Sequence, residues 1–300
     1  MPETNSGLTR LWLQCMPWLF VLLWSTGFVS VKYGLPYIEP LTFLLWRFVL
    51  VIALMLPLTL LMRAAWPNSV RQAAHVAVAG IFMQGGYLGG VFCAIHLGMP
   101  AGVTALVVGI QPILTAFASA PLFGERLLAR QWLGLFLGMV GVALVVLGRT
   151  TLSGITPATL ALSLLALTSI TAGTLYQKRY CGSVDLRTGS VIQFSAAGLI
   201  LLPLALGFET MQVRWSGELM LTLAWLVLVL SIGAVSLLYI LIRRGAATQV
   251  TSLFYLVPPV TALLAYAAFG ERLNAMAVAG MALAALGVAL VVYQRRPNPK

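Results

Sequence analysis

The sequence predicts an all-α integral membrane protein whose ten transmembrane helices form two inverted five-helix repeats. Three observations lead to this prediction. Of the 300 residues, 60% are hydrophobic and only 8% are charged, whereas soluble domains carry about a quarter charged residues. Apolar runs of the length that crosses a bilayer as a helix recur from end to end. The second half of the chain also repeats the first.

The apolar runs are predicted to be helices. Strands of a membrane barrel alternate apolar and polar side chains over about ten residues, and runs such as Val140–Leu147 do not alternate. The first run lacks a clear small-x-small cleavage site, so it is expected to be a helix and not a signal peptide. The predicted helices cover 12–34, 41–62, 73–96, 102–123, 130–148, 157–177, 188–207, 219–241, 249–269 and 275–293.

The basic residues predict how the chain crosses the membrane. Of the 18 Lys and Arg residues, 13 fall on the side of the N-terminus, 4 fall on the opposite side, and Arg47 lies within a span. Cytoplasmic loops carry this kind of excess, so we expect a multi-pass protein of the cell inner membrane with both termini in the cytoplasm. The net charge of +11 forms no basic patch interleaved with aromatic residues, so no nucleic-acid partner is predicted.

The two halves of the chain match at a fixed offset. The segment Phe123–Leu127 returns as Phe269–Leu273, 146 residues later, and near the centre of each half the offset is 147. The sequence therefore predicts one repeat over residues 1–150 and a second over 151–300. Because five helices are an odd number, the second repeat enters the membrane with opposite polarity. Many secondary carriers use such inverted repeats, with the substrate path between them.

The repeated motifs resemble those of the EamA family of the drug/metabolite transporter superfamily. The resemblance rests on Trp24-Ser25-Thr26-Gly27-Phe28, then Pro40 and Arg47, and on Pro112 with Gly124-Glu125-Arg126-Leu127 and Gln131-Trp132-Leu133-Gly134. The second copy runs from Pro258 to Gly287, with Asn274-Ala275-Met276 replacing the Gln-Trp segment. The resemblance implies ten helices, cytoplasmic termini and movement of small metabolites, often amino-acid efflux, through a cavity between the halves.

We therefore expect a secondary transporter of small metabolites that works by alternating access, an exporter of amino acids or related zwitterionic or amphipathic solutes. No phosphate-binding Gly-Lys-Ser/Thr loop and no mid-membrane carboxylate is present. Two alternatives remain open: a non-transporting partner or sensor subunit, and a membrane-embedded enzyme. The enzyme is disfavoured because His75 and His96 lie at opposite ends of one predicted helix. No catalytic residue, metal or cofactor is predicted.

The predicted partners are a small-molecule solute and the lipid bilayer. A homodimer is a further alternative, because Gly134, Gly138 and Gly141 form a small-residue face. Such a face serves either packing within the chain or association between chains.

Two predicted helices carry polar residues beside prolines. Thr104 and Gln111 lie seven residues apart, on one helical face, next to Pro112, which removes a backbone donor. Tyr255 and Pro258 repeat the pattern in the helix 249–269. Polar groups within a span face the protein interior or a wet cavity, so we expect these five residues to line the translocation path. The alternative is a proline kink that only shapes packing.

Three further helices are predicted to contribute to the path. The first carries Trp24, Ser25 and Phe28, and the repeat places Thr171 and Thr174 opposite Ser25 and Phe28 in the helix 157–177. Aromatic rings in a cavity suit an aromatic or amphipathic solute. The helix 73–96 adds Gln84 and Tyr87 to the predicted wall, within a glycine-rich segment that also predicts close helix packing.

Arg47 is the ionisable side chain that falls inside a span. Such residues are functional by default. Two interpretations remain open for it: binding of a substrate carboxylate, or a structural anchor that reaches the outer headgroups or Glu39. Its repeat partner is Gln193, so a positive charge at this position is not required in each of the two halves.

Overall fold

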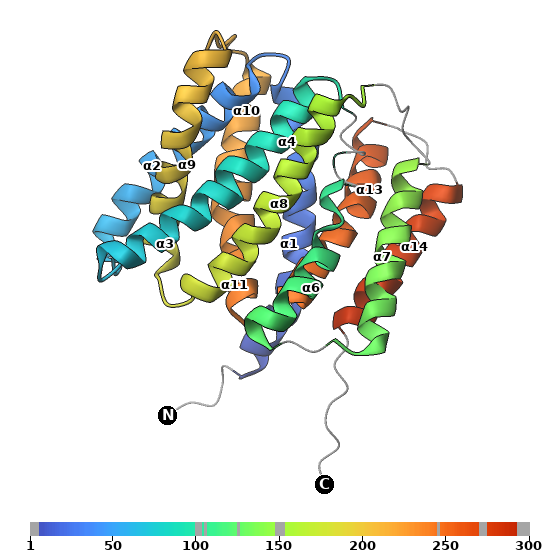
Figure 1. The fold of residues 1–300 in the computed structure, drawn as a ribbon. Helices are drawn as coiled ribbons and strands as arrows, with labels where there is room; N and C mark the ends of the chain where they lie inside the picture. The colour runs from blue at the N-terminus through green and yellow to red at the C-terminus, as the bar shows by residue number, and fades with distance from the viewer. Residues whose placement is uncertain are drawn as a thin grey trace.

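The computed structural model describes residues 6–99, 104, 107–124, 127–147, 154–244, 247–269 and 275–292. These residues are almost entirely helical, and their β-type pairing is limited to an isolated bridge between Ile38 and Val213. Figure 1 shows the helices as one bundle, with α2, α3 and α9 on one side and α7 and α14 on the other. The predicted all-α fold is confirmed.

The first repeat follows the predicted helices closely. It consists of α1 (Ser6–Gly34), α2 (Pro40–Leu61), a third helix made of α3 (Val70–Gly80), η1 (Ile81–Gly86) and α4 (Tyr87–His96), a fourth ending in α6 (Gln111–Phe123), and α7 (Ala129–Leu147).

The second repeat has the same order. It consists of α8 (Pro157–Tyr180), α9 (Leu186–Phe208), a third helix made of α10 (Gly217–Trp225), η2 (Leu226–Ala234) and α11 (Val235–Arg244), a fourth made of α12 (Ala247–Ser252), η3 (Leu253–Leu256) and α13 (Val257–Phe269), and α14 (Ala275–Val292).

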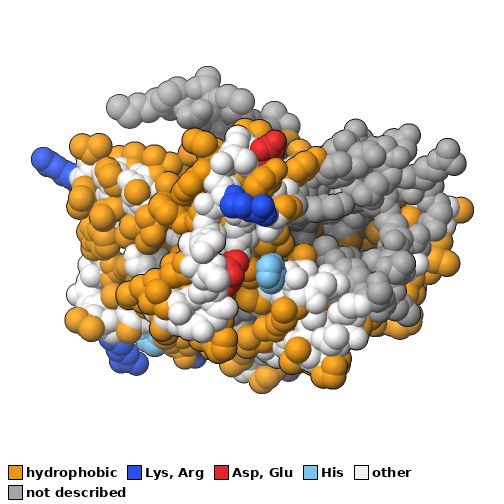
Figure 2. Space-filling model, turned by 90° about the horizontal axis from the view of Figure 1, so that it is seen from above, with side chains coloured by type: hydrophobic (Ala, Val, Ile, Leu, Met, Phe, Trp, Pro, Cys, Tyr) orange, Lys and Arg blue, Asp and Glu red, His pale blue; other side chains and the backbone are white. Residues whose placement is uncertain are grey.

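The helices have the length and apolar surface of membrane spans. Five of those described are long and apolar enough to cross a bilayer, and four shorter apolar stretches lie in α1, α7, α12–α13 and α14. Large apolar side chains on the outside, such as Leu61 and Phe208, are 83% exposed. Figure 2, a view from one end, shows apolar side chains around the rim and few charged ones. This surface suits lipid and not water.

Helices α2 and α9 are counterparts in the two repeats, and they pack against each other. Adding 146 to the bounds of α2 gives 186–207, and α9 covers 186–208. The start of α2 meets the end of α9, where Glu209 accepts hydrogen bonds of 2.7 Å from the Leu41 and Thr42 backbone amides. At the other end the Thr188 hydroxyl donates to Ala65 O at 2.8 Å. The paired helices are therefore antiparallel, which confirms that the repeats are inverted.

Glycines bring α7 and α14 together in the same way. A Cβ atom built on Gly134 would lie 2.6 Å from the Gly287 carbonyl oxygen, and one built on Gly280 would lie 2.6 Å from the Gly141 carbonyl oxygen. The repeat relation converts one contact into the other, because residue 134 corresponds to residue 280 and residue 141 corresponds to residue 287. The glycine face of α7 is therefore used for packing within the chain.

We expect Gly141→Ala to destabilise the protein. The added Cβ would lie 2.7 Å from Gly280 O and 2.9 Å from Ala284 Cα, and backbone atoms on a packed helix cannot move aside easily. Overpacking of this kind costs about 1–3 kcal/mol. Thermal unfolding in detergent should show a lower midpoint. Gly207→Ala is the control, because a Cβ there meets nothing within 4 Å; equal midpoints for the two variants would contradict the close packing.

The third and fourth helices of each repeat depart from α-helical geometry at equivalent positions. Adding 147 to the π-helical η1 gives 228–233, which lies within the π-helical η2. The predicted continuous helix 102–123 is interrupted by a turn at 109–110, just before Pro112, and the 3-10 helix η3 ends just before Pro258. A proline favours the first turn of a new helix because it has no N–H to donate. Of the repeated Gly-Glu-Arg motif, residues 125–126 and 270–272 lie outside the described part.

Candidate solute-binding cavity

A cavity, here called the central cavity, lies between the two repeats. The first repeat contributes α1, α2, η1 and α4, and the second contributes η2 and α11. The empty space between its lining atoms, including the open mouth, is about 540 Å³. It is lined by Trp24, Gly27, Val31, Arg47, Met83, Gln84, Tyr87, Leu88, Val91, Phe92, Ile95, Leu226, Leu230 and Val235.

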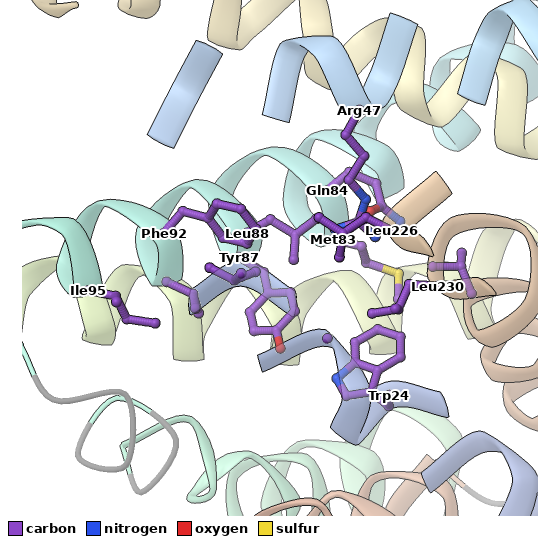
Figure 3. Close-up of a pocket in the computed structure, with 14 residues that line it drawn as sticks. Trp24, Arg47, Met83, Gln84, Tyr87, Leu88, Phe92, Ile95, Leu226 and Leu230 are labelled. Atoms are coloured by element: carbon purple, nitrogen blue, oxygen red, sulfur yellow. The ribbon is translucent and has the colours of Figure 1, made fainter. Parts of the chain in front are cut away.

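Aromatic rings form one wall of the central cavity. Trp24 on α1 and Tyr87 on α4 lie nearly parallel, with ring centroids 6.5 Å apart and an angle of 16°. Phe254 on η3 meets Trp24 edge-on at 5.4 Å, and Phe20 lies 5.2 Å from Trp24. Figure 3 shows Trp24 and Tyr87 on the side of the cavity opposite Arg47. Such a wall holds planar or apolar groups through dispersion and ring stacking.

A second space, the side cavity, shares this aromatic wall. It has a volume of about 360 Å³ and is lined by Trp24, Tyr87, Val91, Thr104, Val108, Gly109, Phe254, Val257 and Pro258. Its floor is the pair of interrupted fourth helices, one from each repeat. Irregular backbone at membrane depth is tolerated where it lines a cavity. The turn at 109–110 and η3 meet this condition because they lie at the side cavity.

Arg47 is the charged residue in the lining of the central cavity. Its side chain is 3% exposed, and its Nε donates to the Ser231 hydroxyl of η2 at 2.8 Å. Figure 3 shows it extending from α2 toward Gln84. The sequence allowed a contact with Glu39, but that carboxylate instead accepts from the backbone amides of Thr210 and Met211.

A chain of buried polar side chains begins at Gln84, at the central cavity, and runs away from it. Gln84 Nε2 donates to the Tyr239 hydroxyl at 3.1 Å, that hydroxyl donates to Gln193 Oε1, and Gln193 Nε2 donates to Gln177 Oε1 at 2.8 Å. Each of the four is at most 3% exposed. The chain joins η1, α11, α9 and α8, so it links the two repeats. We call it the glutamine–tyrosine septum.

A third space, the end cavity, lies beyond the septum. It has a volume of about 190 Å³ and is lined by Val76, Gln177, Cys181, Val184, Asp185, Leu186, Gly189, Gln193, Tyr239 and Arg243. Gln84 thus faces the central cavity, while Tyr239 and Gln193 face the end cavity. At its mouth, the Arg187 side chain hydrogen-bonds the Asp185 carboxylate at 2.7 Å and lowers its pKa below the usual value. The mouth therefore carries fixed charges of both signs.

The structure distributes the predicted path residues over these spaces. Trp24, Arg47, Gln84 and Tyr87 meet in the central cavity, and Thr104 and Pro258 join Trp24 and Tyr87 in the side cavity. The side chain of Phe28 lies outside what the structure describes. The others are buried but line none of the three spaces: Ser25, Gln111, Pro112, Thr171, Thr174 and Tyr255.

Those remaining residues make contacts within a helix or between helices. The Thr171 hydroxyl donates to Leu167 O of its own helix at 2.7 Å. The Ser25 hydroxyl lies 2.7 Å from Val21 O of its own helix and 3.3 Å from Val257 O of α13. Gln111 Nε2 donates to the Thr174 hydroxyl at 3.2 Å, which ties α6 to α8. Tyr255 packs its ring against Gly138 of α7.

Sequence reasoning missed most of the septum and the apolar lining. The repeat relation identified Gln193 as the partner of Arg47 but gave it no place in the path. The same relation could have pointed to Ser231, which follows Gln84 by 147 residues. Tyr239 and Gln177 are polar groups within predicted spans, which is a functional signal in itself. Apolar lining residues such as Leu226 carry no comparable signal. Among the described residues, no three His, Cys, Asp or Glu side chains are placed to hold a metal ion.

The comparisons of this chain with known proteins agree on one family. The profile of the EamA-like transporter family matches residues 12–147 and again residues 157–293. A protein of Escherichia coli (strain K12) named "Probable amino-acid metabolite efflux pump" is 30% identical, over 93% of this chain and 94% of its own. The protein of the same name from Salmonella typhimurium is 28% identical, over 92% and 93%. The "Uncharacterized inner membrane transporter YedA" of Escherichia coli is 26% identical, over 90% and 87%.

The fold also matches a solved structure. A crystal structure superimposes on this chain with a TM-score of 0.75 at 22% identity, covering 92% of this chain and 94% of the other. The predicted family is confirmed: the chain, with its cavity between two inverted repeats, belongs to the EamA-like transporter family and is a membrane transporter, not an enzyme.

Proposed function

We propose that this protein exports amino acids or closely related amphipathic solutes across the inner membrane, with both termini in the cytoplasm. The observation that carries the proposal is the central cavity, which both repeats line and which combines an aromatic wall with Gln84 and Arg47. Relatives of similar length are named as amino-acid metabolite efflux pumps. The excess of Lys and Arg on one side supports the orientation.

Alternating access is the mechanism we propose. The central and end cavities lie on either side of the septum, so rearrangement of its hydrogen bonds would connect the solute to the opposite face. Two repeats that move as bodies would exchange the open and closed sides. A septum made of amides and a hydroxyl suits this role, because its hydrogen bonds can be exchanged for water without exposing an unpaired charge.

We expect Gln84→Leu to abolish export while the protein still reaches the membrane. Leucine keeps the approximate volume but leaves the Tyr239 hydroxyl without its donor and removes the amide from the cavity. The measurement compares metabolites in the medium of bacteria that express the parent protein, the variant or an empty vector at matched membrane levels. A coherent class of amino acids should accumulate only with the parent.

Gln72→Leu is the matched control. Gln72 lies on α3 outside the three cavities, and its amide contacts Asn68 and Ser183. This variant should export like the parent. Medium that is identical for parent and empty vector would rule out efflux of these solutes, and normal export by Gln84→Leu would place the path elsewhere.

A further inference from the structure

Arg47 and its repeat partner are used differently in the two halves. Both polar atoms of the Gln193 amide are already hydrogen-bonded, because it donates to Gln177 and accepts from Tyr239 within the septum. Arg47 makes one hydrogen bond, from Nε to Ser231. That bond leaves both terminal nitrogens of the guanidinium group without a hydrogen-bond partner among the described residues. The first repeat therefore presents to the central cavity a charged group whose terminal nitrogens can bind a ligand.

No carboxylate of the described residues pairs with this charge. Arg47 is the charged residue in the lining of the central cavity. Of the four described acids, Glu39 and Glu209 accept from backbone amides where α2 and α9 meet, and Asp185 pairs with Arg187. The fourth, Glu218, is exposed in the first turn of α10. The Arg47 side chain is only 3% exposed, and it needs a counter-charge because burial of an isolated ion is costly.

We propose that the carboxylate of the transported solute supplies this counter-charge by binding to the terminal nitrogens of Arg47. A planar guanidinium group matches a carboxylate through two parallel hydrogen bonds. One positive charge in an otherwise apolar wall suits a monoanionic group better than a doubly charged phosphate. The inference rests on the proposed function, and it names the group by which the solute is recognised.

The rest of the cavity determines where the remainder of the solute lies. Trp24 and Tyr87 face Arg47 across the cavity (Figure 3) and would receive the apolar or aromatic part. Gln84 uses Nε2 to reach Tyr239, and no described residue donates to its Oε1. That oxygen and the ring faces are the groups that an ammonium on the solute would meet. Ser231 holds the guanidinium group in position through Nε.

The test compares acids with their neutral amides. We would measure binding to the purified protein in detergent, as a shift of the thermal unfolding midpoint, for L-phenylalanine, L-leucine and L-methionine and for the amide of each. The parent protein should bind the acids at least about tenfold more tightly than the amides, since a charge-assisted pair contributes about 1.5–3 kcal/mol, or roughly 10- to 100-fold. Amides that bind as well as the acids would overturn the proposal.

Variants separate recognition from structure. Arg47→Gln should remove the preference for acids over amides, and Arg47→Lys should keep part of it because the charge remains. Ser231→Ala, which keeps the charge, should weaken acid binding by less than tenfold. A purely structural role would lower stability without changing the acid-to-amide ratio.

Arg71→Gln is the charge-matched control, since Arg71 is exposed on the first turn of α3. An unchanged ratio in Arg47→Gln would overturn the proposal.

A second panel separates this inference from the proposed function. If none of the amino acids binds the parent protein, phenylacetate and indole-3-acetate are tested in the same way. Binding of these monocarboxylates that Arg47→Gln abolishes would support the carboxylate site and contradict amino acids as the solute. Binding of neither panel would overturn the carboxylate site itself.

Discussion

Trp24→Ala is expected to reduce export by about tenfold or more at equal membrane levels. Trp24, like Tyr87, lines both the central and the side cavity, and it contacts Phe20, Tyr87 and Phe254. A solute that packs on this ring loses dispersion and stacking when it is removed, and each 1.4 kcal/mol of lost binding weakens affinity about tenfold. The measurement is the initial rate of amino-acid release from cells, normalised to the protein in the membrane.

The loss must be separated from an effect on folding. Removal of a buried tryptophan costs about 3–5 kcal/mol of stability, so Trp24→Phe, which keeps an aromatic ring, should retain part of the export. Trp18→Ala is the matched control, because Trp18 lies on the same helix but is 67% exposed. Equal export by Trp18→Ala and Trp24→Ala would mean that the aromatic wall has no part in transport.

Tyr239→Phe is expected to weaken the septum. The ring remains, but Gln84 loses its acceptor and Gln193 loses its donor. Buried groups left unpaired cost about 1–3 kcal/mol, and this shifts the balance between closed and open septum by about tenfold. In a Leu88→Cys background, on the wall of the central cavity, the introduced thiol should then react faster with a membrane-impermeant thiol reagent added from the side of the end cavity.

The labelling experiment requires replacement of the three native cysteines, Cys15, Cys93 and Cys181. Tyr176→Phe is the control, because it removes a hydroxyl that contacts His75 outside the three cavities. Its labelling rate should match that of the parent. If Tyr239→Phe leaves the rate at position 88 unchanged, the septum is not the barrier between the two cavities.

The fold could be predicted almost completely from the sequence. Apolar runs and the 146-residue offset indicated the helices and their inversion, because both depend on local composition and on the duplicated pattern. The positions of η1 and η2 were not predicted, since a short π-helical segment differs from an α-helix by hydrogen-bond pairing one residue further along the chain, and it left no sign in the hydrophobic pattern. The interruption at 109–110 was signalled by Pro112, but its extent was not.

The candidate site was predicted only in part. Trp24, Gln84, Tyr87 and Arg47 were singled out as polar or aromatic groups deep in spans, and they meet in the central cavity. Helical spacing places residues on one face but does not say which neighbour that face meets. Gln111 shows the difference: it lies on the polar face of α6, yet it contacts Thr174 of α8 and not a cavity.

The most direct test of the account is release of solutes from reconstituted vesicles. Vesicles containing the parent protein, Trp24→Ala or no protein are loaded with an equimolar mixture of the twenty amino acids, and the released fraction of each is measured over time. We predict that the parent releases a subset selectively, with aromatic and large apolar amino acids foremost, and that Trp24→Ala releases this subset about tenfold more slowly. Release by the parent that equals that of protein-free vesicles, or that Trp24→Ala leaves unchanged, would contradict the account.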